Sequence, residues 1–258
     1  MSIKVVVATH VPCEMPTDKL YLPVHVGAEL HPELPFVGDN TGDNISEKNN
    51  TFCELTGLYW AWKNLPDDYV GLVHYRRYFA SPTARRRNSL DSVLAYAQAE
   101  ELLKDYDGIL PAPRHYVIEN LYSHYAHTSY IEPLDVTRTI LEEKYPTYVP
   151  SFDRLKERST AHMFNMFILR RDYFDAYCAW LFDILFELEK RVDARQYTPF
   201  HARFFGRVSE LMLDVWLENN PINCATLPLV HTQKVNWFVK GAAFLAAKFM
   251  GKKYTKSF

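Results

Sequence analysis

Cysteine, net charge and long apolar runs are scarce in this 258-residue sequence, and each scarcity excludes a class of protein. The formal charge of −2 gives no case for a nucleic-acid partner. Without a run of roughly 18 apolar residues, we expect no membrane-spanning helix. No G-x-G-x-x-G follows the first apolar run, which disfavours a dinucleotide-binding protein. Four cysteines lie far apart, with neither a C-x-x-C pair nor zinc-ligand spacing: Cys13, Cys53, Cys178 and Cys224.

Apolar and aromatic residues, by contrast, are abundant. They make up 48% and 15% of the chain, which favours a substantial core over disorder. Isolated cysteines suit buried thiols in a reducing cytosol. We see no secretory signal before the first apolar run and expect a cytoplasmic protein. The length suits one α/β domain, which we place at residues 1–232, followed by a distinct tail at 233–258.

Three apolar runs predict strands that end in small or polar residues. Residues 3–8 (IKVVVA) form an unbroken run, which is typical of a central strand buried on both faces. Residues 22–26 and 69–73 have the pattern of further short strands. Ligands of open α/β sheets bind beyond the carboxyl ends of the strands. The candidate nucleotide contacts after the first two runs are therefore Thr9, His10 and Gly27.

The stretch from Asn49 to Phe79 organises the rest of the chain. Helical spacing of apolar residues predicts a helix at 50–64, with Asn49 at its start as an N-cap and a candidate ligand contact. The strand at 69–73 then ends in basic residues. Guanidinium groups pair with phosphate oxygens, so we expect a phosphate-bearing ligand here; solvated surface charges are the alternative. The candidate contacts are His74, Arg76 and Arg77.

The remaining segments supply weaker candidates. Arg114 could line the same cleft from the loop after the strand at 106–110. His127 lies in a histidine- and tyrosine-rich segment that suits either a sugar-binding surface or an aromatic core. Asp39 suits a turn better than a metal site. We also predict helices at 90–104, 133–145, 172–192 and 206–218, strands at 162–169 and 226–231, and irregular structure at 29–50 and 148–158.

Four blocks of sequence together resemble one bacterial family. They are N-x-x-F-C-E-L-T-G-L-Y-W-A-W-K-N followed by Y-V-G-L-V-H-Y-R-R-Y-F at 49–79, YDGILP at 106–111, NMFILRRDYFDAYCAWLF at 165–182, and RFFGRVSELML at 203–213. The family is that of capsular and exopolysaccharide glycosyltransferases catalogued as domain of unknown function 4422, which includes galactofuranosyltransferases. The resemblance implies a GT-A-like, Rossmann-type mixed sheet flanked by helices, and a nucleotide-sugar-dependent transferase.

The resemblance also implies roles for particular residues. Inverting transfer needs a carboxylate that takes the proton from the acceptor hydroxyl. Glu210 is the predicted general base and Asp214 the runner-up; favourable interaction of Glu210 with the helix dipole is the alternative interpretation. The predicted acceptor contacts are Asn165 and Met166, together with His127.

The metal motif usual in GT-A enzymes, Asp-x-Asp, is absent at its expected place. That place, after the strand at 69–73, holds His74-Tyr75-Arg76 instead. Positive side chains could neutralise a diphosphate directly, as a metal otherwise would. We therefore predict no required cofactor and no metal ligands. A divalent ion such as Mn²⁺ stays open, with His74 as a ligand, because neutral imidazole binds such ions.

The last segment differs in character from the rest. From Pro221 onward the chain carries six lysines and no acidic residue. Lysines interspersed with apolar and aromatic groups at 233–258 predict an amphipathic helix on an anionic membrane surface; a terminal helix packed on the domain is the alternative. His231 and Lys234 are candidate contacts for the donor diphosphate.

Together these features predict a UDP-sugar-dependent hexosyltransferase, peripheral at the inner face of the cell membrane. It would transfer galactose or galactofuranose to a glycan or lipid-linked acceptor in bacterial surface-polysaccharide synthesis. The main alternative is a non-catalytic carbohydrate- or nucleotide-binding protein. A nucleic-acid binder is disfavoured by the near-neutral charge.

Overall fold

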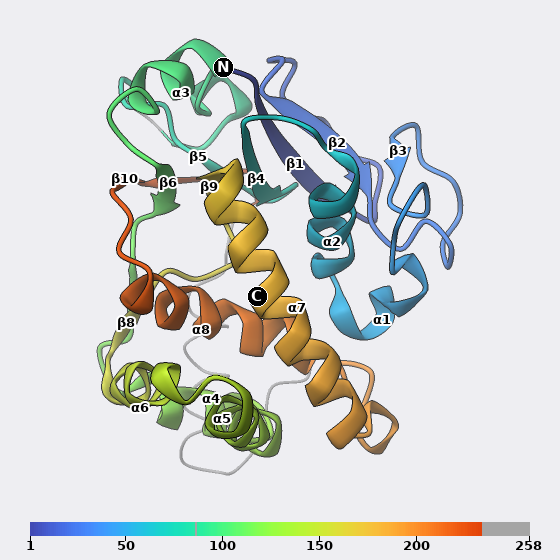
Figure 1. Cartoon of the computed structure of the whole chain (residues 1–258). Coiled ribbons are helices and arrows are strands. Elements are labelled where there is room, and N and C mark those ends of the chain that lie inside the picture. Colours follow the sequence, from blue (N-terminus) through green and yellow to red (C-terminus); the bar gives the residue numbers. More distant parts are fainter. Residues whose placement is uncertain (86, 234–258) are drawn as a thin grey trace.

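The computed structural model describes residues 1–85 and 87–233, which form a mixed sheet with helices on both faces (Figure 1). The strand order is β10-β6-β9-β4-β1-β2-β3, and β5 pairs with both β4 and β11. β1 runs parallel to β2 and β4, whereas β9 runs antiparallel to β4 and β6. The predicted α/β class with a mixed sheet is confirmed. The strands of this sheet are β1 (Ile3–Thr9), β2 (Tyr21–His25), β3 (Val37–Gly38), β4 (Tyr69–His74), β5 (Arg77–Phe79), β6 (Gly108–Pro111), β9 (Phe167–Arg170), β10 (Cys224–Leu227) and β11 (Leu229–His231). Two short strands, β7 (Arg114–His115) and β8 (Thr160–Ala161), pair with each other outside it.

The central strand β1 explains the apolar run at residues 3–8, in which Lys4 is the one polar residue. Val6 and Ala8 face one hydrophobic cluster, while Val5 and Val7 face the other. Burying a side chain of this kind contributes about 1.5–3 kcal/mol relative to leaving it exposed. Polar residues at alternate positions would forfeit that contribution on one face. The prediction of a strand buried on both sides is therefore confirmed.

The helices divide into those that cover the sheet and those that form a separate group beside it. α2 and α7 pack on one face of the sheet, and α3 packs on β1 from the other. α4, α5 and α6 pack together and against α8 (Figure 1). The helices are α1 (Asn49–Phe52), α2 (Leu55–Asn64), α3 (Tyr96–Leu102), α4 (Leu121–Thr128), α5 (Glu132–Lys144), α6 (Val149–Glu157), α7 (Arg171–Arg191) and α8 (Phe204–Asn219).

The organising helix is broken, contrary to the single helix predicted at 50–64. α1 ends at Phe52, and Cys53 adopts φ 54° and ψ −129° before α2 begins. The side-chain amide of Asn49 bridges this break, because its Nδ2 donates to the carbonyl of Cys53 (2.7 Å) and to Thr56 Oγ1 (3.0 Å). Apolar spacing alone continues through the break, so it could not reveal the change of direction.

Several other boundaries also differ from the predictions. Residues 148–158 are not irregular: most of them form α6, which places Phe152 and Leu155 in the core. The strand predicted at 162–169 begins later than expected, at Phe167, the first residue of β9. Before it, Phe164 and Asn165 have φ values of 78° and 51°, which turn the chain. The helix predicted at 90–104 is a short 3₁₀ turn followed by α3, and the strand predicted at 226–231 is split into β10 and β11.

Asp39 has a structural place in the loop between β2 and α1. Its fully buried carboxylate accepts hydrogen bonds from the backbone amides of Gly27 (2.9 Å) and Ala28 (3.0 Å). The hydroxyls of Ser46 (2.5 Å) and Thr56 (2.6 Å) donate to the same group. Buried charges need such partners. The carboxylate therefore ties the turn at Gly27 to the start of α2.

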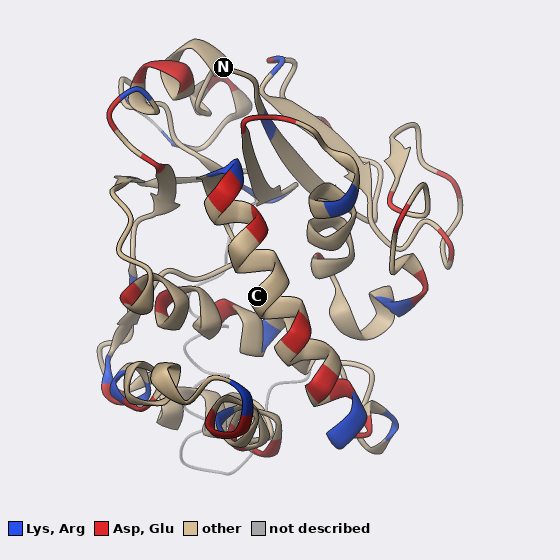
Figure 2. Ribbon diagram, in the orientation of Figure 1, with Lys and Arg blue, Asp and Glu red and all other residues tan. Residues whose placement is uncertain are grey.

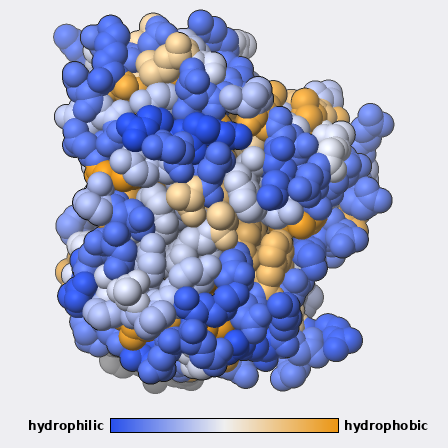
Figure 3. All heavy atoms as spheres, viewed as in Figure 1, coloured by the Kyte–Doolittle hydropathy of each residue, from blue (hydrophilic) through white to orange (hydrophobic). Residues whose placement is uncertain are grey.

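Along α7, basic residues lie at the two ends and acidic residues between them (Figure 2). The face shown in Figure 3 is mostly hydrophilic with small apolar patches. None of the helices within residues 1–85 and 87–233 combines the length and apolarity that crossing a membrane requires. The predicted amphipathic tail at 233–258, including Lys234, lies outside the described residues except for Gln233.

Candidate active site

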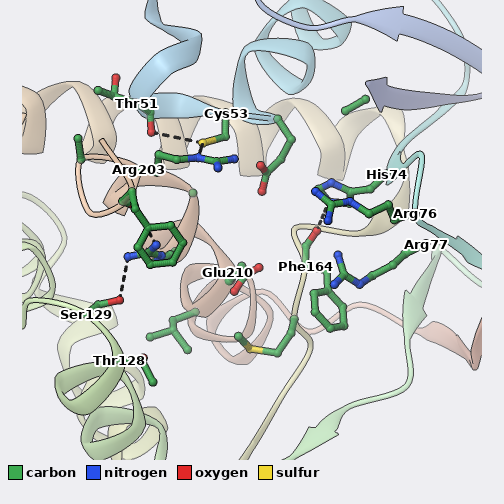
Figure 4. A pocket seen from close by; sticks show the side chains of 18 of the residues that line it. Thr51, Cys53, His74, Arg76, Arg77, Thr128, Ser129, Phe164, Arg203 and Glu210 are labelled. Atoms are coloured by element: carbon green, nitrogen blue, oxygen red, sulfur yellow. Dashed lines mark hydrogen bonds between the residues drawn. The ribbon is translucent and has the colours of Figure 1, made fainter. Parts of the chain in front are cut away.

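A cleft of about 1130 Å³ opens where the carboxyl ends of β1 and β4 face α8 (Figure 4). This is the edge at which an open α/β sheet binds its ligands. β1 and β4 end at this edge, and the break between α1 and α2 also lines the cleft, so several chain segments meet there. The polar and aromatic lining residues include His10, Asn49, Cys53, Glu54, His74, Tyr75, Arg76, Arg77, Arg114, Tyr116, His124, Tyr125, Ser129, Phe164, Arg203, Arg207 and Glu210.

Three of the lining arginines have no acidic partner. Across residues 1–85 and 87–233, neither Arg76, Arg77 nor Arg114 forms an ion pair. Arg76 lies over the ring of Tyr75, and Arg77 over the ring of Phe164, with guanidinium carbon to ring centroid distances of 5.0 and 4.4 Å. Burial lowers the pKa of Arg77, and its Nε is buried without a hydrogen-bond partner. Such unpaired donors are ready to bind an anion.

Two further arginines in the cleft are already engaged. Arg203 Nε lies 2.8 Å from the thiol of Cys53, at the helix break. Arg207 donates to the hydroxyl of Ser129 and to the carbonyl of Phe200, both at 2.9 Å. Arg207 thereby joins α8 to the end of α4. These two arginines add positive charge to the cleft but hold neighbouring segments together.

Glu210 points into the cleft from α8 (Figure 4). Its carboxylate makes no hydrogen bond or ion pair with any described residue. Burial and, after it, the negative charge of Glu54 together raise the pKa of Glu210 to about 7, against the opposing charges of Arg77 and Arg114. A carboxylate with a pKa near the working pH combines basicity with a sizeable ionised fraction. Glu210 therefore has the properties of a general base.

The runner-up for that role, Asp214, is placed differently. It lies one turn after Glu210 on α8 but is outside the lining of the cleft. Its carboxylate accepts from the backbone amide of His162 (2.8 Å) and lies 2.5 Å from Nδ1 of the same residue. Asp214 thus anchors the segment before β9.

The structure brings together six of the residues predicted for the site. His10, Asn49, His74, Arg76, Arg77 and Glu210 all line the cleft, as does Arg114. His74 contributes no positive charge at neutral pH, because burial lowers its pKa. Its Nε2 lies 2.5 Å from the carbonyl of Phe164, to which it donates. The histidine therefore holds the turn before β9.

The other predicted contacts lie outside the cleft lining. Thr9 is fully buried and donates to the carbonyl of Val11 (2.7 Å). Gly27, at φ 72°, packs so closely on Asn49 that an added Cβ would lie 2.6 Å from its side chain. Met166 is fully buried in the core. The three remaining residues are Asn165, which contacts Glu54, His127, which pairs with Glu119, and His231, which is exposed on β11.

Three charged residues that line the cleft have no role predicted from the sequence: Glu54, Arg203 and Arg207. Glu54 is hidden in the predicted helix at 50–64, where an acidic residue on the polar side is unremarkable. The one available signal was its position within the most family-specific block, directly after Cys53.

The described residues do not fit the divalent ion usual in GT-A enzymes. Among residues 1–85 and 87–233, no group of three or more His, Cys, Asp or Glu side chains could hold a metal ion. The place of Asp-x-Asp at the end of β4 is basic. The described residues therefore offer no ligand set for such an ion, and metal independence stays a prediction.

Comparisons with known proteins agree with the fold. No curated protein matches the sequence. An apo structure of the bifunctional glycosyltransferase WbbM is similar to this chain, with a TM-score of 0.83, 27% sequence identity and 91% of this chain covered. The chain spans about half the length of that protein, covering 46% of it. The predicted GT-A-like fold is confirmed by this match. A family model matches residues 4–221, so the chain belongs to the family described as Domain of unknown function (DUF4422).

Proposed function

We propose that this protein is a glycosyltransferase that moves a hexosyl group from a UDP-sugar to the hydroxyl of a glycan or lipid-linked acceptor. The observation that carries the proposal is a cleft that holds three arginines and the carboxylate of Glu210, none of which has an ion-pair partner within residues 1–85 and 87–233. Similarity to the glycosyltransferase WbbM supports the reaction class. Galactose or galactofuranose as the sugar, and bacterial surface polysaccharide as the product, rest on the family resemblance.

The arginines suit the diphosphate of the donor. As the bond between the sugar and the diphosphate breaks, negative charge develops on the leaving phosphate oxygen. Fixed guanidinium groups around that oxygen stabilise the charge without further reorganisation. Arg76 directly precedes β5, Arg77 is its first residue, and Arg114 lies on β7; all three line the cleft, and the charges of Arg77 and Arg114 act on Glu210. We assign the diphosphate to these three residues, and to His74 only an indirect, supporting part.

Glu210 suits the acceptor side of the reaction. The acceptor oxygen forms a bond to the anomeric carbon, its proton passes to the carboxylate of Glu210, and the electron pair of the broken bond leaves with UDP. The anomeric configuration inverts in this single displacement. Because Glu210 has no hydrogen-bond partner among the described residues, its oxygens are available to the acceptor hydroxyl.

The experiment that tests the proposal is a screen for UDP release. The full chain is incubated with a panel of UDP-hexoses and with oligosaccharide or lipid-linked acceptors, and acceptor-dependent UDP release is measured. A sugar that is transferred supports the enzyme, and the product identifies the linkage. Binding of UDP with no transfer to any acceptor would favour the non-catalytic binding protein.

The pH dependence of transfer should follow Glu210. Because the base must be ionised and burial raises its pKa to about 7, kcat/KM is expected to rise through pH 7 and to level off above it. Below the midpoint, activity should fall about tenfold per pH unit. Initial rates at saturating UDP-sugar and limiting acceptor, measured from pH 5 to 9, check this. A profile that stays flat through this range would contradict Glu210 as the base.

Contact with an anionic membrane surface is proposed from sequence alone. The lysines and aromatic residues that suggest it lie at 233–258, outside the described residues apart from Gln233. A lipid-linked acceptor would make such a location useful.

A further inference from the structure

The cleft contains a second carboxylate, Glu54, that the transfer described above does not use. Glu54 lies in the break between α1 and α2, directly after Cys53. Its side chain rests on the first turn of α8, because a Cβ added at Gly206 would lie 3.6 Å from Glu54 Oε1. Gly206 precedes Glu210 by four residues, and positions four apart lie on one face of a helix. Glu54 and Glu210 therefore occupy the same side of α8.

Asn165 fastens Glu54 in this position. Its Nδ2 donates to Glu54 Oε1 (2.7 Å) and to the carbonyl of Gly206 (3.0 Å). The side chain is 2% exposed, and its Oδ1 is buried without a partner. Both acceptors need an N–H donor, and only the nitrogen of the amide carries two, so the amide must keep this orientation. Its oxygen, Oδ1, is left without a hydrogen-bond partner as a result. One amide thus joins the carboxylate to α8.

The turn that carries Asn165 is itself fixed from two sides. Phe164 and Asn165 both have positive φ, a conformation that persists in non-glycine residues only where the surroundings impose it. His74 donates to the carbonyl of Phe164, and Arg77 lies over the ring of the same residue. Both contacts hold the turn over the cleft. The position of Glu54 is therefore determined by a chain of contacts that runs from β4 to α8.

We propose that Glu54 is a positioning residue of the transfer reaction: its charge, held against α8 by Asn165, keeps Glu210 basic enough to take the acceptor proton. The inference rests on the proposed function. In this proposal Glu54 exchanges no proton with the acceptor. When Glu210 accepts the acceptor proton it becomes neutral, which relieves the repulsion between the two carboxylates and favours the transfer.

Electrostatics around the pair agree with this division of roles. Glu54 forms no ion pair with any described residue, and it stands at the N-terminus of α2, where the helix dipole attracts negative charge. After burial, the charge of Glu54 is the largest contribution that raises the pKa of Glu210. The titratable and charged groups that face Glu210 are Glu54 at the helix break, Arg77 on β5, Arg114 on β7, Tyr125 on α4 and Arg207 on α8.

Titration of Glu210 by NMR tests the pairing without any need for activity. Side-chain carboxyl carbons of glutamate are labelled with ¹³C in the full chain, and the Glu210 signal is identified by its loss in Glu210→Gln. We expect a midpoint of about 7 in the wild type. In Glu54→Gln the midpoint should move to lower pH, on the order of one pH unit, the scale of coupling between interacting carboxylates. Glu47→Gln, an exposed site on the 3₁₀ turn before α1, should leave it unchanged. An unchanged midpoint in Glu54→Gln would overturn the proposal.

A second variant removes the fastening amide and leaves both carboxylates in place. Asn165→Gly keeps a residue that tolerates the positive φ, so the turn can persist. It should move the Glu210 midpoint in the same direction as Glu54→Gln. In both variants, the pH at which kcat/KM falls on the acid side should shift together with the NMR midpoint of Glu210, and kcat should be reduced several-fold. An acid-side fall that stays at the wild-type pH would contradict the link between Glu54 and proton transfer. If the wild type transfers no sugar at all, the proposed function fails, while the NMR titration still decides the pairing.

Discussion

Replacing Glu210 with glutamine is expected to lower kcat by about 10²- to 10⁴-fold while UDP still binds with wild-type affinity. The glutamine amide has nearly the same shape as the carboxylate but cannot accept the proton of the acceptor hydroxyl. The loss should therefore appear in kcat and not in donor affinity. UDP release at saturating donor and acceptor, together with calorimetric titration of UDP, separates the two quantities.

Matched controls for this variant lie on the same helix. Glu218→Gln changes an acidic residue of α8 outside the cleft that pairs with Arg154 and Arg158, and its kcat should stay within about twofold of wild type, because surface ion pairs contribute little. Asp214→Asn should lower thermal stability before it lowers kcat, because Asp214 anchors His162. Near-normal transfer by Glu210→Gln would exclude Glu210 as the base.

Replacing Arg76 with alanine should weaken UDP binding by about 10- to 100-fold. A hydrogen bond to a charged group contributes about 1.5–3 kcal/mol, and each 1.4 kcal/mol corresponds to a factor of ten in affinity. Arg76 is the cleaner variant because Arg77 also stacks on Phe164, so that removing Arg77 would disturb the turn before β9. Calorimetric titration with UDP measures the effect directly.

The control for Arg76→Ala is Arg85→Ala. Arg85 is exposed in the loop after β5 and does not line the cleft. The two variants remove the same charge from the whole chain, so a difference between them reports on the cleft alone. Equal UDP affinity in the wild type and Arg76→Ala would mean that the diphosphate is held elsewhere.

The parts of the fold that local pattern determines could be predicted from the sequence. β1 is a run of apolar residues because both of its faces are buried, and α7 and α8 show broad apolar stripes because each packs on the core along its length. The basic end of β4 could also be located from the sequence, because the apolar residues of the strand are followed directly by basic ones.

The features that sequence could not predict depend on contacts between distant segments. Cys53 adopts an unusual backbone conformation where Asn49 bonds across the break and Arg203 meets its thiol. Asn165 lies behind the cleft wall because its amide is used by Glu54 and Gly206. No periodicity marks such residues, and the pairing of Glu54 with Glu210 joins residues 156 positions apart that only the fold brings together.

The most direct test of an arginine-held diphosphate is calorimetric titration of the wild-type protein with UDP, first in EDTA and then in Mn²⁺. If Arg76, Arg77 and Arg114 neutralise the diphosphate, UDP should bind with the same affinity, within about twofold, in both buffers. Binding that is absent in EDTA and restored by Mn²⁺ would contradict this arrangement and would mean that the diphosphate is held through a metal.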